Sequence, residues 1–245
     1  PEGCGGLALA LAYAQFISCE NRQPVDSCGV CKSCVKYEKL IHPDLHFVFP
    51  VIKDKKNNEP VSDNYIEQWR EFVKHSSFFT LNKWLDTIEV GNAQGLIFAS
   101  EASEIIKKLS LKSFESDFKI MIIWLPEKMH LSTANKLLKL IEEPPEKTLF
   151  LLVSEEPDKV IPTILSRCQI VKIPGFRKEE IAAYLSDRFE LSGPKAKDVA
   201  QVANGNIARA IEMCENEDTS ILNLDRFKNV MRYAWKRDVI ALITW

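Results

Sequence analysis

The sequence lacks the features that would assign it to a membrane or secretory class. No run of about 18 or more uncharged apolar residues occurs among its 245 residues, so it offers no candidate transmembrane helix. The N-terminus does not show the basic, apolar and small-residue order of a secretory signal. These absences predict a cytoplasmic protein that works without a membrane.

The sequence also lacks an excess of charge of either sign. It contains 32 Lys and Arg against 34 Asp and Glu, so no overall basic field indicates nucleic-acid binding. Apolar residues make up 46% of the chain, which is enough to build one large or two modest domains with a core. Composition therefore predicts a globular protein and leaves its partners open.

Apolar runs predict a parallel sheet in the first part of the chain. Lys119–Trp124 and Thr148–Val153 are continuous apolar runs of strand length, typical of strands buried on both faces of such a sheet. Gln169–Ile173 is expected to be a third strand. Ser132–Glu143 lies between the first two runs and ends at Pro144-Pro145, so we expect it to be the crossover helix.

The rest of the chain reads mainly as helices. Further elements are expected at Leu7–Ser18, Lys36–Ile41, Asp63–Asp86, Ser100–Leu109, Lys178–Phe189, Pro194–Ala203 and Asn206–Cys214 (helices) and at Leu45–Val51 (a strand). Pro174-Gly175 separates the mixed pattern from the purely helical one. We therefore expect an α/β domain over 1–175, a small helical domain over 176–220 and the start of a third unit over 221–245. A longer native chain is expected at both ends.

The first residues look like a phosphate-binding loop that lacks the side chains needed for ATP hydrolysis. Gly3, Gly5 and Gly6 precede a helix, as in loops whose backbone N–H groups cradle phosphates. In a working loop the lysine that reaches the outer phosphates would stand at Gly6, and the hydroxyl that holds magnesium would stand at Leu7. ATP hydrolysis by this chain is not expected. A glycine turn that only caps the helix is the alternative, and a dinucleotide site is discounted because no strand end with an acid follows.

Four of the seven cysteines fall within sixteen residues, at Cys19, Cys28, Cys31 and Cys34. Four thiolates close a tetrahedral structural zinc site, and Gly29 allows the loop between them to fold back. Four unrelated reduced cysteines are the alternative, but single cysteines are usually buried separately. An iron–sulfur cluster is the other rival, and the spacing lacks its typical fourth interval and following proline. Residues 19–34 are therefore predicted to form a zinc module.

Two longer motifs carry a family resemblance. Asn135–Pro145 (Asn-Lys-Leu-Leu-Lys-Leu-Ile-Glu-Glu-Pro-Pro) and Ile161–Cys168, which ends in Ser-Arg-Cys, resemble the clamp-loader branch of the AAA+ ATPases. With His42-Pro43-Asp44 and the cysteine spacing, the resemblance extends from residue 1 to about residue 215. It is similar to the bacterial gamma/tau and delta-prime families. The resemblance implies an AAA+ P-loop-like domain, a helical lid and a truncated C-terminal collar.

The resemblance also implies how the ATP chemistry is divided. The magnesium-binding Asp-Glu pair falls at Trp124-Leu125, neither of which can ligate magnesium. Arg167 is retained, and the resemblance implies an arginine finger that acts in trans on a neighbour's ATP. We therefore expect a non-hydrolysing subunit of a DNA polymerase III holoenzyme.

The partners implied by the resemblance are gamma/tau and delta clamp-loader subunits, together with the sliding clamp and primer-template DNA through the assembled complex. An active gamma/tau-like ATPase and a zinc-dependent interaction module outside replication are the alternative functions. The segment from Phe47 to Gly95 departs from the shorter gamma/tau pattern, and its role is not apparent from the sequence.

Overall fold

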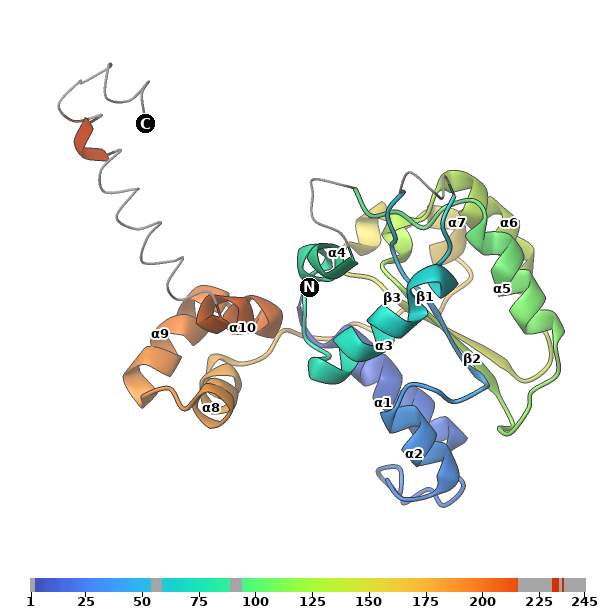
Figure 1. Cartoon of the computed structure of the whole chain (residues 1–245), viewed down its shortest axis with the longest axis horizontal. Helices are drawn as coiled ribbons and strands as arrows, with labels where there is room; N and C mark the ends of the chain where they lie inside the picture. The colour runs from blue at the N-terminus through green and yellow to red at the C-terminus, as the bar shows by residue number, and fades with distance from the viewer. Residues whose placement is uncertain (1–2, 54–58, 89–93, 216–230, 234, 236–245) are drawn as a thin grey trace. The chain divides into compact units, whose positions relative to one another are not determined.

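The computed structural model describes residues 3–53, 59–88, 94–215, 231–233 and 235 (Figure 1). The chain divides into two compact units, Pro1–Gly175 and Phe176–Trp245. Most of the expected third part at 221–245 lies outside the described residues, as do Pro1 and Glu2 of the glycine-rich loop. The division into α/β domain, lid and collar therefore stays a prediction.

A parallel sheet forms the centre of the first unit. Within the described residues it has three strands in the order β1-β2-β3, with bounds Leu45–Val48, Lys119–Trp124 and Thr148–Val153. Leu45 is opposite Ile120 in one pair, and Lys119 is opposite Thr148 in the other. The expected mixed α/β class with a parallel sheet is confirmed.

Helices cover both faces of this sheet (Figure 1). Side chains from α1, α2, α3 and α4 join one apolar cluster, and side chains from α5, α6 and α7 join the other. The bounds are α1 Gly6–Ser18, α2 Lys32–Glu38, α3 Ile66–His75, α4 Leu81–Ile88, α5 Glu101–Ser110, α6 Leu131–Glu142 and α7 Pro162–Leu165. Short 3-10 helices lie at Ser62–Tyr65, Pro126–Lys128 and Pro157–Lys159. No helix in the described part of the chain is long and apolar enough to cross a lipid bilayer.

Strand β2 is the central strand and is buried at all six positions. Successive side chains of a strand point to opposite faces of a sheet. Ile122 and Trp124 accordingly join the cluster under α1, α3 and α4, while Met121 and Ile123 join the cluster under α5, α6 and α7. A continuous apolar run is therefore what this position requires.

Two strand expectations need correction. All six residues of β3 are half-buried, although their apolar run predicted burial on both faces. The expected strand at Gln169–Ile173 is absent from the structure, and Ile170 and Val171 in it are 60% and 72% exposed. The partial exposure of β3 fits its place at the edge, because no described strand lies beside its outer side.

Two helix expectations also differ from the structure. The helix expected at Lys36–Ile41 is α2, which begins four residues earlier at Lys32 and ends at Glu38. The single helical run expected over Asp63–Asp86 is divided into a 3-10 turn, α3 and α4. It breaks at Ser76, whose hydroxyl accepts the N–H of Phe78 at 3.1 Å and donates to the carbonyl of the same residue at 3.0 Å. A serine that bonds the backbone in this way favours a turn over a helix.

The second unit is a small helical bundle within its described residues. It contains α8 (Lys178–Phe189), α9 (Gly193–Ala203) and α10 (Ile207–Glu215). Ile181 and Leu185 of α8 are fully buried against a row of alanines that includes Ala196, Ala200 and Ala210. Small side chains allow the three helices to approach closely around a limited core.

Glu101 is a fully buried acid at the start of α5 in the first unit. One carboxylate oxygen accepts the Ser62 N–H at 2.7 Å and lies 3.1 Å from the Ser62 hydroxyl. Burial raises the pKa of Glu101 from 4.5 to about 7, and these Ser62 contacts only partly oppose the increase. The folded state therefore holds a proton on Glu101 more tightly than the unfolded chain does.

We predict that this acid makes stability fall as the pH rises. The folded-state pKa is raised, so the stabilising contribution is complete below about pH 4.5 and is lost as the pH rises through about 7. Glu101→Gln should remove that slope and stabilise the protein at pH 8 by up to about 3 kcal/mol. Urea unfolding at a series of pH values measures this. Glu104→Gln, on the same helix but half-exposed, is the matched control. An unchanged slope in Glu101→Gln would contradict the prediction.

Candidate functional site

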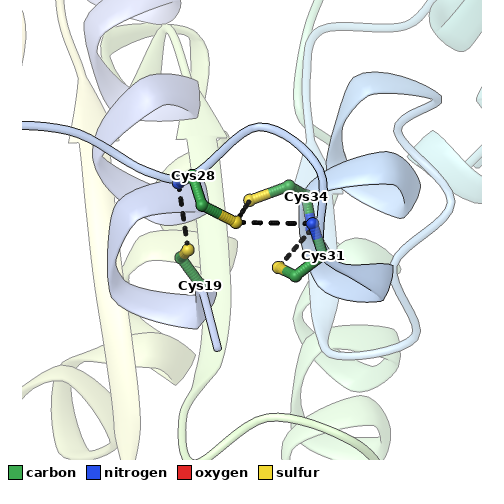
Figure 2. A group of neighbouring side chains, drawn as sticks. All are labelled: Cys19, Cys28, Cys31 and Cys34. Carbon is green, nitrogen blue, oxygen red and sulfur yellow. Dashed lines mark hydrogen bonds between the residues drawn. The ribbon is translucent and has the colours of Figure 1, made fainter. Parts of the chain in front are cut away.

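The four cysteines of the predicted zinc module lie together in the structure. Cys19 directly follows α1, Cys34 lies in α2, and Cys28 and Cys31 lie on the loop between these helices. The four sulfur atoms are all within 4.8 Å of one another, and Figure 2 shows them directed into one shared space. A tetrahedral zinc–sulfur site has sulfurs about 3.8 Å apart, so a small contraction would complete it.

Backbone N–H groups turn toward the sulfurs around this space. The N–H groups of Cys28, Cys31 and Cys34 point to the sulfurs of Cys19, Cys28 and Cys31 at 3.3, 3.4 and 3.4 Å. The last of these contacts makes the Cys31 sulfur the N-cap of α2. Gly29 adopts a left-handed φ of 72°, which supplies the turn that the loop needs. These N–H groups would stabilise negatively charged sulfur.

The electrostatics of the cluster favour a cation. Burial acts to raise the pKa of Cys31, but hydrogen bonds from Cys34 and Glu20 outweigh it and bring the pKa to about 6. Burial raises the pKa of Cys34 to about 12. Four thiolates this close would repel one another, and a bound cation is what allows all four to ionise. The donor set therefore fits a metal ion that prefers sulfur.

The carboxylate of Asp44 holds a loop that contacts the helix carrying Cys34. Asp44 is 2% exposed, and its two oxygens accept the N–H groups of Phe114, Glu115 and Ser116 at 2.6, 2.8 and 2.8 Å. Glu115 in turn pairs with Lys36 of α2 at 2.5 Å. Asp44 thus holds the loop before β2, and this loop reaches the helix that carries Cys34 through Glu115 and Lys36.

The glycine-rich loop turns through left-handed glycines and is crowded by side chains of two other segments. Gly3 and Gly5 have left-handed φ values of 63° and 79°, and Gly5 is the N-cap of α1. A Cβ atom on Gly6 would lie 3.0 Å from Val153 Cγ1 and 3.8 Å from Ile173 Cδ1. A lysine at Gly6 would therefore begin in a crowded position between two segments.

A small cavity lies beside this loop, with room for only a few water molecules. The glycine loop forms one wall, the ends of β2 and β3 form a second, and Ser77–Phe79 form a third. Trp124, at the position expected for a magnesium-binding acid, lines the cavity and is 2% exposed. Trp124 therefore places apolar surface at the position expected for the magnesium-binding acid, and Ser154 and Glu155 line the cavity at the end of β3.

Helices α3 and α4 lie within the segment from Phe47 to Gly95, whose role was not apparent from the sequence. Trp69 of α3 lies 5.3 Å from Trp124 between ring centroids, and Phe79 lies 5.1 Å from Trp124. Trp84 of α4 meets Trp69 edge-on at 5.0 Å. Aromatic pairs at these separations add to the free energy of burial. The segment from residue 66 to residue 88 therefore packs an aromatic cluster onto the end of β2, next to the glycine loop.

Arg167 lies two residues after the short helix α7 and outside this cavity. Its Nε donates to Glu142 Oε2 at 3.0 Å, and its Nη1 donates to the Thr163 carbonyl at 3.0 Å. The Arg167 residue is exposed. The structure thus brings the four cysteines together and the three glycines together, but Arg167 does not line the glycine-loop cavity.

Sequence reasoning missed two contributors to these places. Ser77–Phe79 line the cavity, and only a long insertion between strands could have signalled them. Glu142 contacts Arg167, and its sole signal was its place in the Glu-Glu-Pro-Pro motif. Both contacts join segments more than twenty residues apart, which local patterns do not reveal.

Comparison with known proteins gives the family. The family model described as DNA polymerase III, delta subunit, matches residues 1–177. DNA polymerase III subunit delta' of Bacillus subtilis (strain 168) is 26% identical over 217 residues, which cover 89% of this chain and 52% of the relative. The gamma/tau subunit of Mycobacterium tuberculosis (strain ATCC 25618 / H37Rv) is 26% identical over 170 residues, which cover 68% of this chain and 22% of that one.

A solved structure is also similar. It is a DNA polymerase III gamma subunit-related protein from Thermotoga maritima, with a TM-score of 0.37 and 22% identity, covering 48% of this chain and 38% of that one. The chain spans about half the length of the delta' relatives from B. subtilis and Escherichia coli. Because the family model matches well over half of the chain, this protein belongs to the DNA polymerase III delta subunit family, as a delta'-like member of the clamp-loader branch.

Proposed function

We propose that this chain is a non-hydrolysing clamp-loader subunit that supplies an arginine to a neighbour's ATP site. One contrast carries the proposal. Trp124 is buried at the glycine-loop cavity, where an ATPase needs acids, whereas Arg167 is exposed and lies outside that cavity. The groups for hydrolysis in cis are lost, and the group for catalysis in trans is kept.

This chain would fail to hydrolyse ATP itself for a steric reason and a chemical reason. A triphosphate needs a lysine and a magnesium ion with oxygen ligands. Gly6 and Leu7 supply neither, and Trp124 and Leu125 are buried apolar side chains. The aromatic cluster of α3 and α4 leaves only a small cavity beside the loop. These observations favour the delta'-like role over an active gamma/tau-like ATPase.

Arg167 would act on ATP held by an adjacent subunit. A planar guanidinium can bridge two phosphate oxygens and neutralise the charge that develops during phosphoryl transfer. The relatives named delta' and gamma/tau support gamma/tau and delta subunits as partners in the ring. Through that ring the chain would help load a sliding clamp onto primer-template DNA.

The cysteine module would hold one structural zinc ion. Four sulfur ligands leave no open position, so the metal would support the fold rather than catalyse a reaction. It would tie the loop at 19–34 to α1 and α2, beside the Asp44 contacts. The second unit, beginning at Phe176, would serve as the helical lid, and the residues from 221 would begin a collar domain.

The zinc proposal is tested by metal analysis. Protein purified without chelator should contain about one equivalent of zinc, and Cys28→Ser should reduce this to well under half an equivalent. Cys168→Ser, at a half-buried cysteine outside the cluster, should leave the zinc content unchanged. A disulfide among the four cysteines, or wild-type protein without metal, would reject the proposal.

The proposal also predicts no ATP hydrolysis by the isolated chain. Gly6→Lys alone should not restore turnover, because Trp124 and Leu125 still provide no magnesium ligand. The measurement is phosphate release from a preparation freed of other ATPases, with an assembled clamp loader as the positive control. Turnover above background in the wild-type chain would favour the gamma/tau-like alternative.

A third prediction concerns Arg167 in the assembled ring. Arg167→Ala should lower DNA-stimulated ATP turnover at the neighbouring site, by about 10³-fold where fingers of this kind have been characterised. Arg167→Lys should rescue poorly because an ammonium lacks the planar fork. The melting temperature of the free subunit should change little, since the Arg167 side chain lies at the surface.

Arg177→Ala is the matched control for this experiment. Arg177 is also exposed and also pairs with a glutamate, Glu180 at 2.6 Å, but it lies in the second unit. Its removal should leave ring turnover unchanged. Normal assembly with unchanged turnover in Arg167→Ala would leave Arg167 a structural residue.

A further inference from the structure

The contact between Glu142 and Arg167 joins two helices that share one core. Glu142 is the last residue of α6, and Arg167 follows α7 by two residues. Leu137 and Ile141 of α6 and Ile164 of α7 are buried in the same apolar cluster. The two side chains therefore project from a common rigid base, and the Nε–Oε2 distance of 3.0 Å is set by helices rather than by mobile loops.

Glu142 accepts a hydrogen bond from the guanidinium at Nε and none from its two terminal nitrogens. Of the five N–H donors of an arginine, Nε–H points to Glu142 and one Nη1–H points to the Thr163 carbonyl. Nη2 has no hydrogen-bond partner among the described residues. Nη2 and the second Nη1–H thus remain available to phosphate oxygens, while Nε and the first Nη1–H fix the plane of the guanidinium group.

We propose that Glu142 is a positioning residue for Arg167, an inference that rests on the proposed trans role of the arginine. By accepting from Nε, the carboxylate orients the guanidinium plane before the neighbour's ATP arrives. An arginine side chain without such a contact loses the freedom to rotate about several bonds when it binds, and this loss of conformational entropy opposes binding. Because Glu142 already orders the side chain, part of this entropy loss occurs before ATP is met. The position of a catalytic group also matters, because small errors in it lower the reaction rate strongly.

A purely structural role explains the contact poorly. Glu142 and Arg167 have side chains 55% and 32% exposed, and ion pairs at such sites contribute little to folding stability. The neighbouring Glu143 offers the comparison, because it has the same charge, follows directly in the chain and makes no contact with Arg167 in the described part of the structure. The Oε2 contact, rather than general negative charge at the end of α6, is what distinguishes Glu142.

The test uses an assembled clamp loader in which only the ATP site next to this chain is left active. Glu142→Ala should lower kcat at that site by about tenfold to a hundredfold, with KM for ATP changed less than about twofold. Glu142→Gln should fall between Glu142→Ala and wild type, because its amide oxygen still accepts from Nε without the charge. Glu143→Ala should match wild type, and the free subunits should melt alike.

A double-mutant cycle shows whether Glu142 acts through Arg167. In an Arg167→Ala background, Glu142→Ala should cause no further loss, since nothing remains to be positioned. Wild-type kcat in Glu142→Ala, or an independent loss in the Arg167→Ala background, would overturn the inference. If Arg167→Ala itself leaves turnover unchanged, the proposed trans role fails first, and the two failures are thereby distinguished.

Discussion

The packing of Trp124 against Trp69 and Phe79 is the contact on which the arrangement at the carboxyl end of the sheet depends. In a parallel sheet this end is where ligands are usually bound, because the strands all deliver their following loops there. Here the central strand ends in a buried indole that contacts rings from an inserted helical segment. The choice of one residue type at the end of β2 thus decides both how α3 and α4 dock and what the adjacent glycine loop can hold.

The opposite end of β2 is fixed by charge and hydrogen bonding instead of aromatic packing. The Asp44 carboxylate accepts three consecutive backbone N–H groups, so the chain enters β2 at a defined position. Removing it would leave three donors to find other partners, at a cost of about 1–3 kcal/mol for each donor left buried. The same loop reaches α2 through Glu115 and Lys36. A metal bound by the cysteines would therefore stiffen a module already tied to the central strand.

The sequence predicted those elements whose signal is local. The bounds of β2 and β3 agree with the expected bounds, and the chain turns soon after each strand, at Leu125-Pro126 after β2 and at Ser154 after β3. The start of α2 was missed because the Cys31 sulfur caps it, and helix propensities take no account of a sulfur cap. The strand expected at Gln169–Ile173 was wrong, because an apolar run does not show whether a segment pairs with a sheet, and Ile170 and Val171 are exposed here. The cysteine grouping was predictable from spacing, whereas the aromatic docking onto Trp124 depends on contacts between distant segments.

Arg167 lies outside the cavity beside the glycine loop, and this position bears on which ATP it could act on. An arginine that served its own subunit's nucleotide would have to line the cavity formed by the glycine loop, and Arg167 does not. Its guanidinium sits instead at a surface, fixed at Nε by Glu142 and at Nη1 by the Thr163 carbonyl. A cation exposed in this way gains little from its own fold, but it gains much when phosphate oxygens and a second protein surface exclude water around it. On the proposed trans role, such a group would act only in an assembly, and the chemistry of the neighbouring site would depend on the presence and position of this subunit.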